Sequence, residues 1–190
     1  MSVSHKSGQK LIMDIFSWDE VLQVLAVARE ECSADRLLLA LTVIYALRRA
    51  EAVSLKADNL DGEYLVLKRG KGSKPVKRKL LVHENPLLNV RDELLETARK
   101  TLFNQRLFPM SARTFQRRVH YYGEKAGLPK FLCHPHTLRH SIIQHLRDNG
   151  MELEEIQEIS GHVSLDSLRR YLHPTPAVIE TKFALALGCP

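Results

Sequence analysis

Apolar residues recur every three to four positions along most of this chain, which predicts a fold built mainly from α-helices. The first helix begins at Ser17, because Ser17 and Glu20 form a capping box and Phe16 with Val21 forms a hydrophobic staple. The stretch LLLALTVIYAL follows, and its helix is expected at the centre of the core because almost every residue in it is apolar. The helices predicted in this way cover residues 17–31, 34–45, 86–100 and 111–126.

Residues 134–171 predict three further short helices with well-defined ends. Gly150 ends the first and Gly161 ends the second, since glycine readily adopts the left-handed conformation that follows many helices. Ser164 can cap the third, and Pro174 limits its length. His162 is therefore expected in a tight turn between two helices.

Between these helical parts the pattern changes to that of β-strands. Two short strands are predicted at residues 64–68 and 76–82, and Gly70 and Gly72 supply the turn that joins them into an antiparallel hairpin. The fold class is therefore α+β, mainly α-helical, with a small antiparallel hairpin or sheet.

The hairpin is strongly basic, with seven Lys or Arg residues and no acid between residues 64 and 83. Long cationic side chains beside turn glycines suit a nucleic-acid backbone, although lysines that protect a solvated sheet edge from aggregation would give the same pattern. The helix over 111–126 adds three arginines, which suit either a DNA groove or a soluble helix face. The predicted DNA contacts are Lys68, Arg69, Lys74, Lys77, Arg113, Arg117 and Arg118.

Composition narrows the class of partner. The chain has 190 residues, 44% of them hydrophobic, and 28 Lys and Arg against 22 Asp and Glu, a net charge of +6 that favours a polyanionic partner. Its three scattered cysteines form no CxxC pair and so indicate neither a disulfide framework nor a zinc ribbon. The N-terminus lacks a signal peptide and no apolar run is long enough to cross a bilayer, so a reducing cytoplasmic location is expected.

Two arginines occupy unusual positions. His136 and Arg139 lie three residues apart at a predicted helix start, so both side chains project from one face. Arg48 directly follows the most apolar helix, where a charge requires partners, and Glu51 is expected to brace the turn that carries it. Arg48 and Arg139 are candidates to bind a phosphodiester, since guanidinium groups stabilise charge on its non-bridging oxygens.

The remaining candidates supply a nucleophile and proton transfer. Tyr171 could attack phosphorus, because a phosphotyrosine bond preserves the energy of the cleaved strand. Lys71 on the hairpin turn could protonate the departing 5′ hydroxyl, and His136 and His162 could bind the phosphate or accept the phenolic proton.

Each of these residues also has an ordinary structural explanation. Arg139 alone could be a surface arginine, Tyr171 a half-buried tyrosine, and His140 a packing or supporting group beside Arg139. Zinc is disfavoured, because the spacing of the nearby Cys and His residues matches no standard site. That cluster consists of Cys133, His134, His136 and His140, and the competing tyrosines are Tyr45, Tyr64, Tyr121 and Tyr122.

Taken together, these motifs resemble the catalytic domain of tyrosine recombinases, also called phage integrases, a family that includes the Xer-type enzymes. The segments that carry the resemblance are residues 46–51 (ALRRAE), 70–74 (GKGSK), 136–140 (HTLRH), 161–162 (GH) and Tyr171. The resemblance implies that Arg48, Lys71, His136, Arg139, His162 and Tyr171 are catalytic, with Glu51 and His140 in support. It also implies site-specific cutting and rejoining of DNA through a 3′-phosphotyrosine, without metal, ATP or other cofactor.

The resemblance further implies an organisation and partners. Residues 1–15 would be a flexible lead-in, 16–175 the catalytic domain, and 176–190 a tail or apolar helix that subunits exchange, or that docks on its own domain. The expected partners are a double-stranded recombination site, further copies in a dimer or tetramer on DNA, and accessory DNA-bending proteins, all at the nucleoid. The family has glycine where this chain has Ala46, and most members carry an N-terminal helical domain that is not expected here.

Two other functions share these features. One is nicking and closing of DNA like a type IB topoisomerase, without site-specific exchange. The other is a non-catalytic DNA-binding regulator derived from an integrase, although such a protein has no chemical use for Tyr171 and Lys71 together.

Overall fold

The computed structural model describes residues 15–69, 75–162, 164–171, 179–180, 183–184 and 186–187, and only the main chain of residues 169–171. Within these ranges the α-helices are α1 (Trp18–Glu31), α2 (Ser33–Ile44), α3 (Arg49–Val53), α4 (Arg91–Lys100), α5 (Ala112–Lys125), α6 (Pro135–Asp148) and α7 (Leu153–Ser160). The 3-10 helices are η1 (Ala57–Asn59), η2 (Lys130–Leu132) and η3 (Leu165–Tyr171), and the strands are β1 (Leu60–Asp61), β2 (Tyr64–Leu67) and β3 (Val76–Lys79). The predicted mainly helical α+β fold is confirmed.

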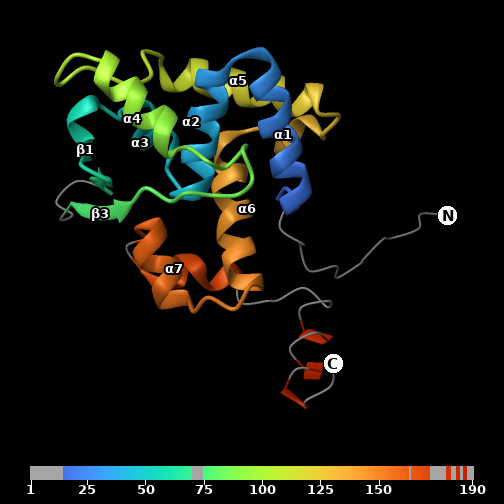
Figure 1. The fold of residues 1–190 in the computed structure, drawn as a ribbon. Coiled ribbons are helices and arrows are strands. Elements are labelled where there is room, and N and C mark those ends of the chain that lie inside the picture. The colour runs from blue at the N-terminus through green and yellow to red at the C-terminus, as the bar shows by residue number, and fades with distance from the viewer. Residues whose placement is uncertain are drawn as a thin grey trace.

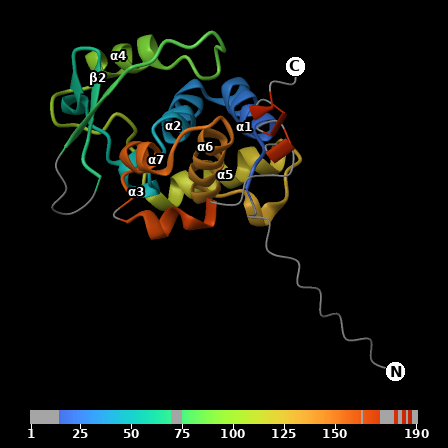
Figure 2. The ribbon, with the colours of Figure 1, turned by 90° about the horizontal axis from the view of Figure 1, so that it is seen from below.

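The core surrounds α2, the helix that the apolar run predicted at the centre. Every side chain from Asp35 to Val43 is buried, and α2 packs against α1, α3 and α6. Figure 1 shows α6 passing through the middle of the molecule beside α2, with the sheet to one side and α7 below, and Figure 2 shows the same helices nearly end-on. Because each fully buried Leu or Val stabilises the fold by about 1.5–3 kcal/mol, this central helix is a rigid base for the loops at its end.

The start of α1 follows its sequence signal closely. The amide of Ser17 donates to the Glu20 carboxylate at 2.7 Å, and Ser17 Oγ accepts from the Glu20 amide at 3.3 Å, which confirms the capping box. Phe16 is buried, and its amide donates to Ser141 Oγ on α6 at 2.9 Å. The capping segment is thereby tied to the central helix.

The sheet is a three-stranded antiparallel meander in the order β1-β2-β3. In β2, Leu65 and Leu67 are buried and alternate with exposed or half-buried residues, as expected of a sheet with one face on the core. The antiparallel pairing of the two predicted strands is confirmed, although the second ends at Lys79 instead of residue 82 and the turn at residues 70–74 lies outside the described part of the chain. The strand β1 was not predicted, because two residues are too few to show alternation. Gly62, with φ of +60°, makes the turn between β1 and β2.

Two helix predictions were wrong in detail. The helix predicted from residue 86 begins only at Arg91, because the Asn85 side chain accepts from the Leu87 amide at 2.9 Å and holds residues 86–89 in a turn. The helix predicted after Ser164 is the 3-10 helix η3 instead. The exchanged or docked helix predicted at 176–187 falls largely outside the described residues.

No helix within the described ranges combines the length and apolar character needed to span a membrane.

Candidate active site

Arg48 lies between α2 and α3, at the N-cap position of α3. Its guanidinium donates to Glu51 Oε1 at 2.8 Å, to the Arg69 carbonyl at 2.9 Å and to the Gly161 carbonyl at 2.8 Å. Its side chain keeps 37% exposure. Arg48 is therefore fixed in direction while more than a third of its side chain remains open to solvent.

Glu51 joins two arginines. Oε2 accepts from the Arg48 amide at 2.8 Å and from Arg69 Nη1 at 3.2 Å, while Oε1 accepts from the Arg48 side chain. The bracing contact that the sequence predicted between Glu51 and Arg48 is present. The bond to Arg69 was not foreseen.

Arg139, on α6, is almost fully buried, with 1% exposure. Its guanidinium donates to the Ala46 carbonyl and, at 2.9 Å, to the Ser160 carbonyl. Burial first, and then the nearby Arg48, lower the pKa of Arg139 to about 9. An anion beside the two arginines would offset this unfavourable charge, so the site is suited to bind one.

Arg69 occupies the same cluster, where burial lowers its pKa and Glu51 partly opposes that effect. Its guanidinium donates to the Tyr45 carbonyl at 2.6 Å and to the Ile159 carbonyl. Arg69, a predicted DNA contact, is only 4% exposed, and its guanidinium is committed to these internal acceptors.

The arginines are held by the ends of two helices. Carbonyls at the end of a helix lack intrahelical donors and carry a partial negative charge. At the end of α2 these are the carbonyls of Tyr45 and Ala46, and at the end of α7 they are those of Ile159, Ser160 and Gly161. The two helix ends therefore solvate three guanidinium groups that would otherwise repel one another.

Backbone geometry makes this arrangement possible. Ala46 has φ of +46° and Gly161 has φ of +66°, both in the left-handed region. At these points the chain turns away from its helix, which exposes the last carbonyls to the arginines. At φ of +46° a glycine would be less strained than Ala46.

His162 follows this turn and faces Arg139. One of its ring nitrogens lies 3.3 Å from Arg139 Nη2, and Nδ1 lies 2.6 Å from Ser160 Oγ. The Gln157 side chain donates to the His162 carbonyl at 3.0 Å. The imidazole is therefore oriented from both sides, and the buried Ser160 is a site residue that sequence reasoning missed.

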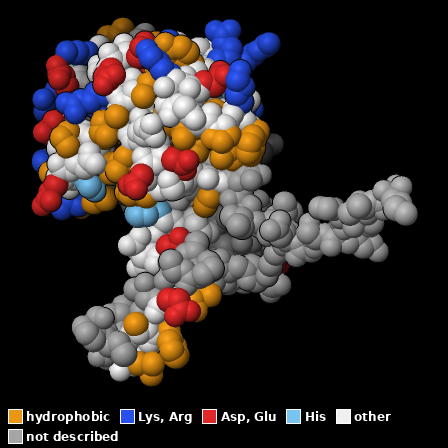
Figure 3. Space-filling view, turned by 90° about the vertical axis from the view of Figure 1, so that its right-hand side faces the viewer, with side chains coloured by type: hydrophobic (Ala, Val, Ile, Leu, Met, Phe, Trp, Pro, Cys, Tyr) orange, Lys and Arg blue, Asp and Glu red, His pale blue; other side chains and the backbone are white. Residues whose placement is uncertain are grey.

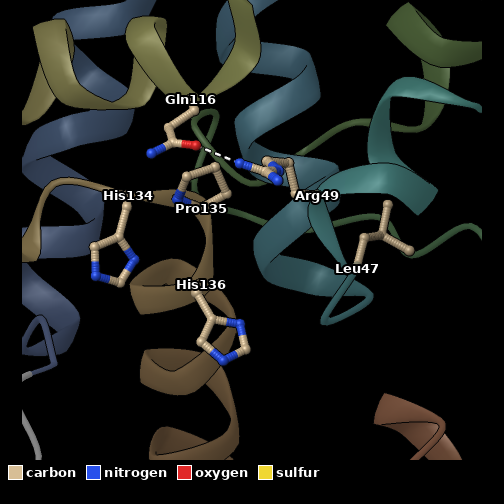
Figure 4. Close-up of a pocket in the computed structure, with 6 residues that line it drawn as sticks. All are labelled: Leu47, Arg49, Gln116, His134, Pro135 and His136. Atoms are coloured by element: carbon tan, nitrogen blue, oxygen red, sulfur yellow. Dashed lines mark hydrogen bonds between the residues drawn. The ribbon is translucent and has the colours of Figure 1, made fainter. Parts of the chain in front are cut away.

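His136 lies at the exposed start of α6. Its ring packs edge-on against that of His140, with 4.1 Å between centroids. Together with His134 and Arg49 it lines a pocket of about 320 Å³, in which Arg49 is hydrogen-bonded to Gln116 of α5 (Figure 4). The structure thus brings Arg48, Glu51, Arg139 and His162 into one cluster and places His136 beside a neighbouring pocket.

The predicted lysine, the predicted nucleophile and the other predicted DNA contacts lie outside this cluster or outside the described residues. Lys71, Lys74 and the side chain of Tyr171 lie outside the described part of the chain. Lys68, Lys77, Arg113 and Arg117 are exposed, although Lys77 pairs with the equally exposed Asp61. Arg118 is paired with the buried Asp35. Lys and Arg side chains, interspersed with acidic ones, gather along the upper part of the face in Figure 3, the end of the molecule that holds α5 in Figure 1.

Two of the competing tyrosines are committed to internal bonds. The Tyr45 hydroxyl donates to the Lys79 carbonyl at 3.1 Å, and burial raises the pKa of Tyr45 to about 12. The Tyr122 hydroxyl donates to Asp35 at 2.6 Å, and burial and that carboxylate raise its pKa further. Both are poor nucleophiles, which leaves Tyr64 and Tyr121 as exposed alternatives to Tyr171.

Comparison with known proteins was made by sequence and by structure. The family model described as the phage integrase family matches residues 15–177. Tyrosine recombinase XerD of Bifidobacterium longum is 33% identical over 200 residues, a match that covers 95% of this chain and 65% of that protein. Tyrosine recombinase XerA of Thermococcus onnurineus is 31% identical over 163 residues, with coverage of 83% and 57%.

Solved structures give the same fold. The XerA recombinase structure superimposes with a TM-score of 0.73 at 19% identity and covers 98% of this chain and 66% of its own. The catalytic domain of bacteriophage HP1 integrase superimposes with a TM-score of 0.61 at 21% identity, covering 90% and 93%. The chain spans less than two thirds of the length of the curated relatives cited here, and it belongs to the phage integrase family.

Proposed function

We propose that this chain is a tyrosine-type site-specific recombinase, which cuts and rejoins DNA strands through a 3′-phosphotyrosine at Tyr171. The phenolic oxygen of Tyr171 attacks the scissile phosphorus and loses its proton, a P–O bond forms to tyrosine, and the bond to the 5′ oxygen breaks. Lys71 gives that oxygen a proton. The 5′ hydroxyl of a partner strand reverses these steps, so bond energy is conserved and neither ATP nor a metal is required.

The observation that carries this proposal is the arginine cluster around Glu51. Arg48 and Arg69 pair with Glu51, while the nearby Arg139 has only main-chain carbonyls and the His162 ring beside it, which leaves an excess of positive charge in a largely buried setting. A phosphodiester that develops charge in the transition state would be bound by Arg48 and Arg139, both already oriented by helix-end carbonyls. Such preorganised donors act without reorganisation at the moment of reaction.

The histidines have separate tasks in this mechanism. His162, held by Ser160 and next to Arg139, donates a hydrogen bond to a phosphate oxygen or accepts the phenolic proton. His136 contacts the phosphate from the start of α6, with His140 supporting its ring. Glu51 acts through Arg48, whose direction it fixes.

The DNA partner and assembly follow from the same proposal. The exposed Lys68, Lys77, Arg113 and Arg117 contact the duplex backbone. One structural relative, XerH, was solved bound to a palindromic difH substrate, and another, lambda integrase, as a dimer on a core site. This chain would likewise act on duplex DNA as a dimer or tetramer at the nucleoid, with accessory DNA-bending proteins at some sites.

The proposed function also assigns a role to each of three segments of the chain. Residues 16–175 form the catalytic unit, close to the 15–177 that the family model matches. Residues 1–15 are a lead-in, and residues 176–190 pass to a neighbouring subunit in the DNA-bound assembly.

The test is a suicide-substrate assay. Nicked duplexes that carry candidate sites from the gene's own genomic neighbourhood are incubated with the protein in EDTA, and SDS-resistant protein–DNA adducts are counted. Wild type and the control Tyr121→Phe, at an exposed tyrosine, should form the adduct, and Tyr171→Phe should not. Tight DNA binding without any adduct would instead favour the regulator. Relaxation of plasmids that lack a site, without strand exchange, would favour the topoisomerase-like activity.

A further inference from the structure

Arg69 connects three parts of the chain that are far apart in sequence. Nη2 donates to the Tyr45 carbonyl at 2.6 Å and to the Ile159 carbonyl, while Nη1 lies 3.2 Å from Glu51 Oε2. The side chain is 4% exposed. One guanidinium therefore joins the end of α2, the start of α3 and the end of α7.

The rest of Arg69 touches the same site. Its carbonyl accepts from Arg48 Nη1 at 2.9 Å. Its aliphatic stem packs against Gly161 so closely that a Cβ at position 161 would lie 2.7–2.8 Å from three Arg69 carbons. The main chain of Arg69 thus holds Arg48, and the side chain supports the turn that precedes His162.

Glu51 links the position of Arg48 to that of Arg69. One carboxylate oxygen accepts from the Arg48 side chain and the other from the Arg69 side chain. A rotation of the carboxylate would break both bonds, so the bond to Arg69 also fixes the bond to Arg48. In sequence, Arg69 lies two residues after the end of β2 and two residues before Lys71, the proposed general acid.

We propose that Arg69 is a positioning residue of this anion site, which sets Arg48 and the turn before His162 in the geometry that binds a phosphate. Arg69 acts through its neighbours, since its guanidinium is committed to Glu51 and to the Tyr45 and Ile159 carbonyls. The effect of Arg69 on catalysis rests on the proposed recombinase function. Its effect on anion binding does not depend on that function and can be measured separately.

Arg36 is a matched control. It is also a buried arginine, 1% exposed, and it donates to the Leu87 carbonyl and pairs with Glu93. Its partners lie outside the arginine cluster. Replacing either arginine by Met keeps most of the side-chain volume but removes its hydrogen bonds and its ion pair, so both variants should lose stability. Only Arg69→Met should disturb the anion site.

The first measurement is the affinity of the folded protein for inorganic phosphate, from the shift in Tm with phosphate concentration. We expect Arg69→Met to weaken the affinity by roughly tenfold or more, and Arg36→Met to change it by about twofold at most. Phosphate binding within about twofold of wild type in Arg69→Met, or no phosphate binding by wild type, would overturn the proposal.

Should Arg69→Met fail to fold, two milder variants decide the question. Arg69→Lys keeps the charge but cannot reach all three acceptors, and Gly161→Ala pushes the Arg69 stem out of place. Both should weaken phosphate binding while the matched Gly127→Ala, at an open position with φ of +77°, should not. Wild-type affinity in both site variants would contradict the positioning role.

The second measurement separates this proposal from the recombinase function. On DNA that wild type cleaves, Arg69→Met should slow single-turnover adduct formation by roughly tenfold or more, with the Kd for DNA changed by less than about threefold. An unchanged rate would overturn the positioning role and leave the function intact. If wild type forms no adduct but Arg69→Met still loses phosphate binding, the function fails and the positioning role stands.

Discussion

Replacing Glu51 by Gln should destabilise the protein strongly, because Glu51 is the acid shared by Arg48 and Arg69. The side chain is 14% exposed, so water can only partly replace the lost charge. Glutamine keeps the shape and one acceptor oxygen, and it still suits the N3 position of α3. The substitution therefore isolates the charge.

The magnitude follows from the contacts. Two charge-assisted bonds, to Arg48 Nη1 and Arg69 Nη1, lose their ionic partner. Each is worth roughly 1.5–3 kcal/mol, and breaking a buried ion pair costs about 3–5 kcal/mol, so we expect a loss of about 3 kcal/mol. For a chain of this size the Tm should fall by about 6–12 °C.

Urea unfolding followed by circular dichroism measures this loss, with an unchanged m-value showing that the unfolded state is not altered. Glu96→Gln is the matched control, since Glu96 pairs with Lys100 on the surface with 62% exposure, and it should leave the free energy of unfolding nearly unchanged. A loss below about 1 kcal/mol for Glu51→Gln would refute the reasoning, because the arginines would then not depend on this carboxylate.

Three further predictions concern the same cluster. Ala46→Gly should stabilise the protein by about 0.5–1 kcal/mol in urea unfolding, because φ of +46° is strained for alanine, and a loss of stability would contradict this. Gly161→Ala should lower the free energy of unfolding by more than about 2 kcal/mol, because its Cβ would meet the Arg69 stem. Gly127→Ala, which has open space around it, should lower it by about 1 kcal/mol. Equal losses in the two variants would contradict the close packing of Arg69 against Gly161. Because the pKa of Arg139 is lowered to about 9 and a bound anion raises it, binding of sulfate, which does not itself titrate between these pH values, should take up protons at pH 9 and almost none at pH 7, as calorimetry in buffers of different ionisation enthalpy would show. Equal proton uptake at both pH values would exclude Arg139 as the titrating group.

Much of the fold could be predicted because its signals are local. The capping box at Ser17 and the apolar run of α2 each depend on neighbouring residues, and both appear in the structure as expected. The contact between Arg48 and Glu51 is also local, three residues apart. At Asn85 a local turn replaces the first residues of the helix that the apolar pattern predicted, so the predicted helix began too early.

The surroundings of Arg69 could not be predicted, because its partners are distant in sequence. The Tyr45 and Ile159 carbonyls lie 24 and 90 residues away, and main-chain acceptors leave no trace in side-chain patterns. In a run of cations, Arg69 is indistinguishable from its exposed neighbour Lys68. The one sequence signal was Gly161, whose small size permits the Arg69 stem to approach.

The measurement that tests the central claim most directly is to locate the protein–DNA bond by mass spectrometry. The adduct trapped on a nicked substrate is digested with nuclease and trypsin, and the modified peptide is sequenced. The account predicts a 3′-linked nucleotide on the tyrosine of the peptide that runs from Tyr171 to Lys182. A nucleotide on Tyr64 or Tyr121, or no modified peptide from DNA that the protein demonstrably cleaves, would contradict it.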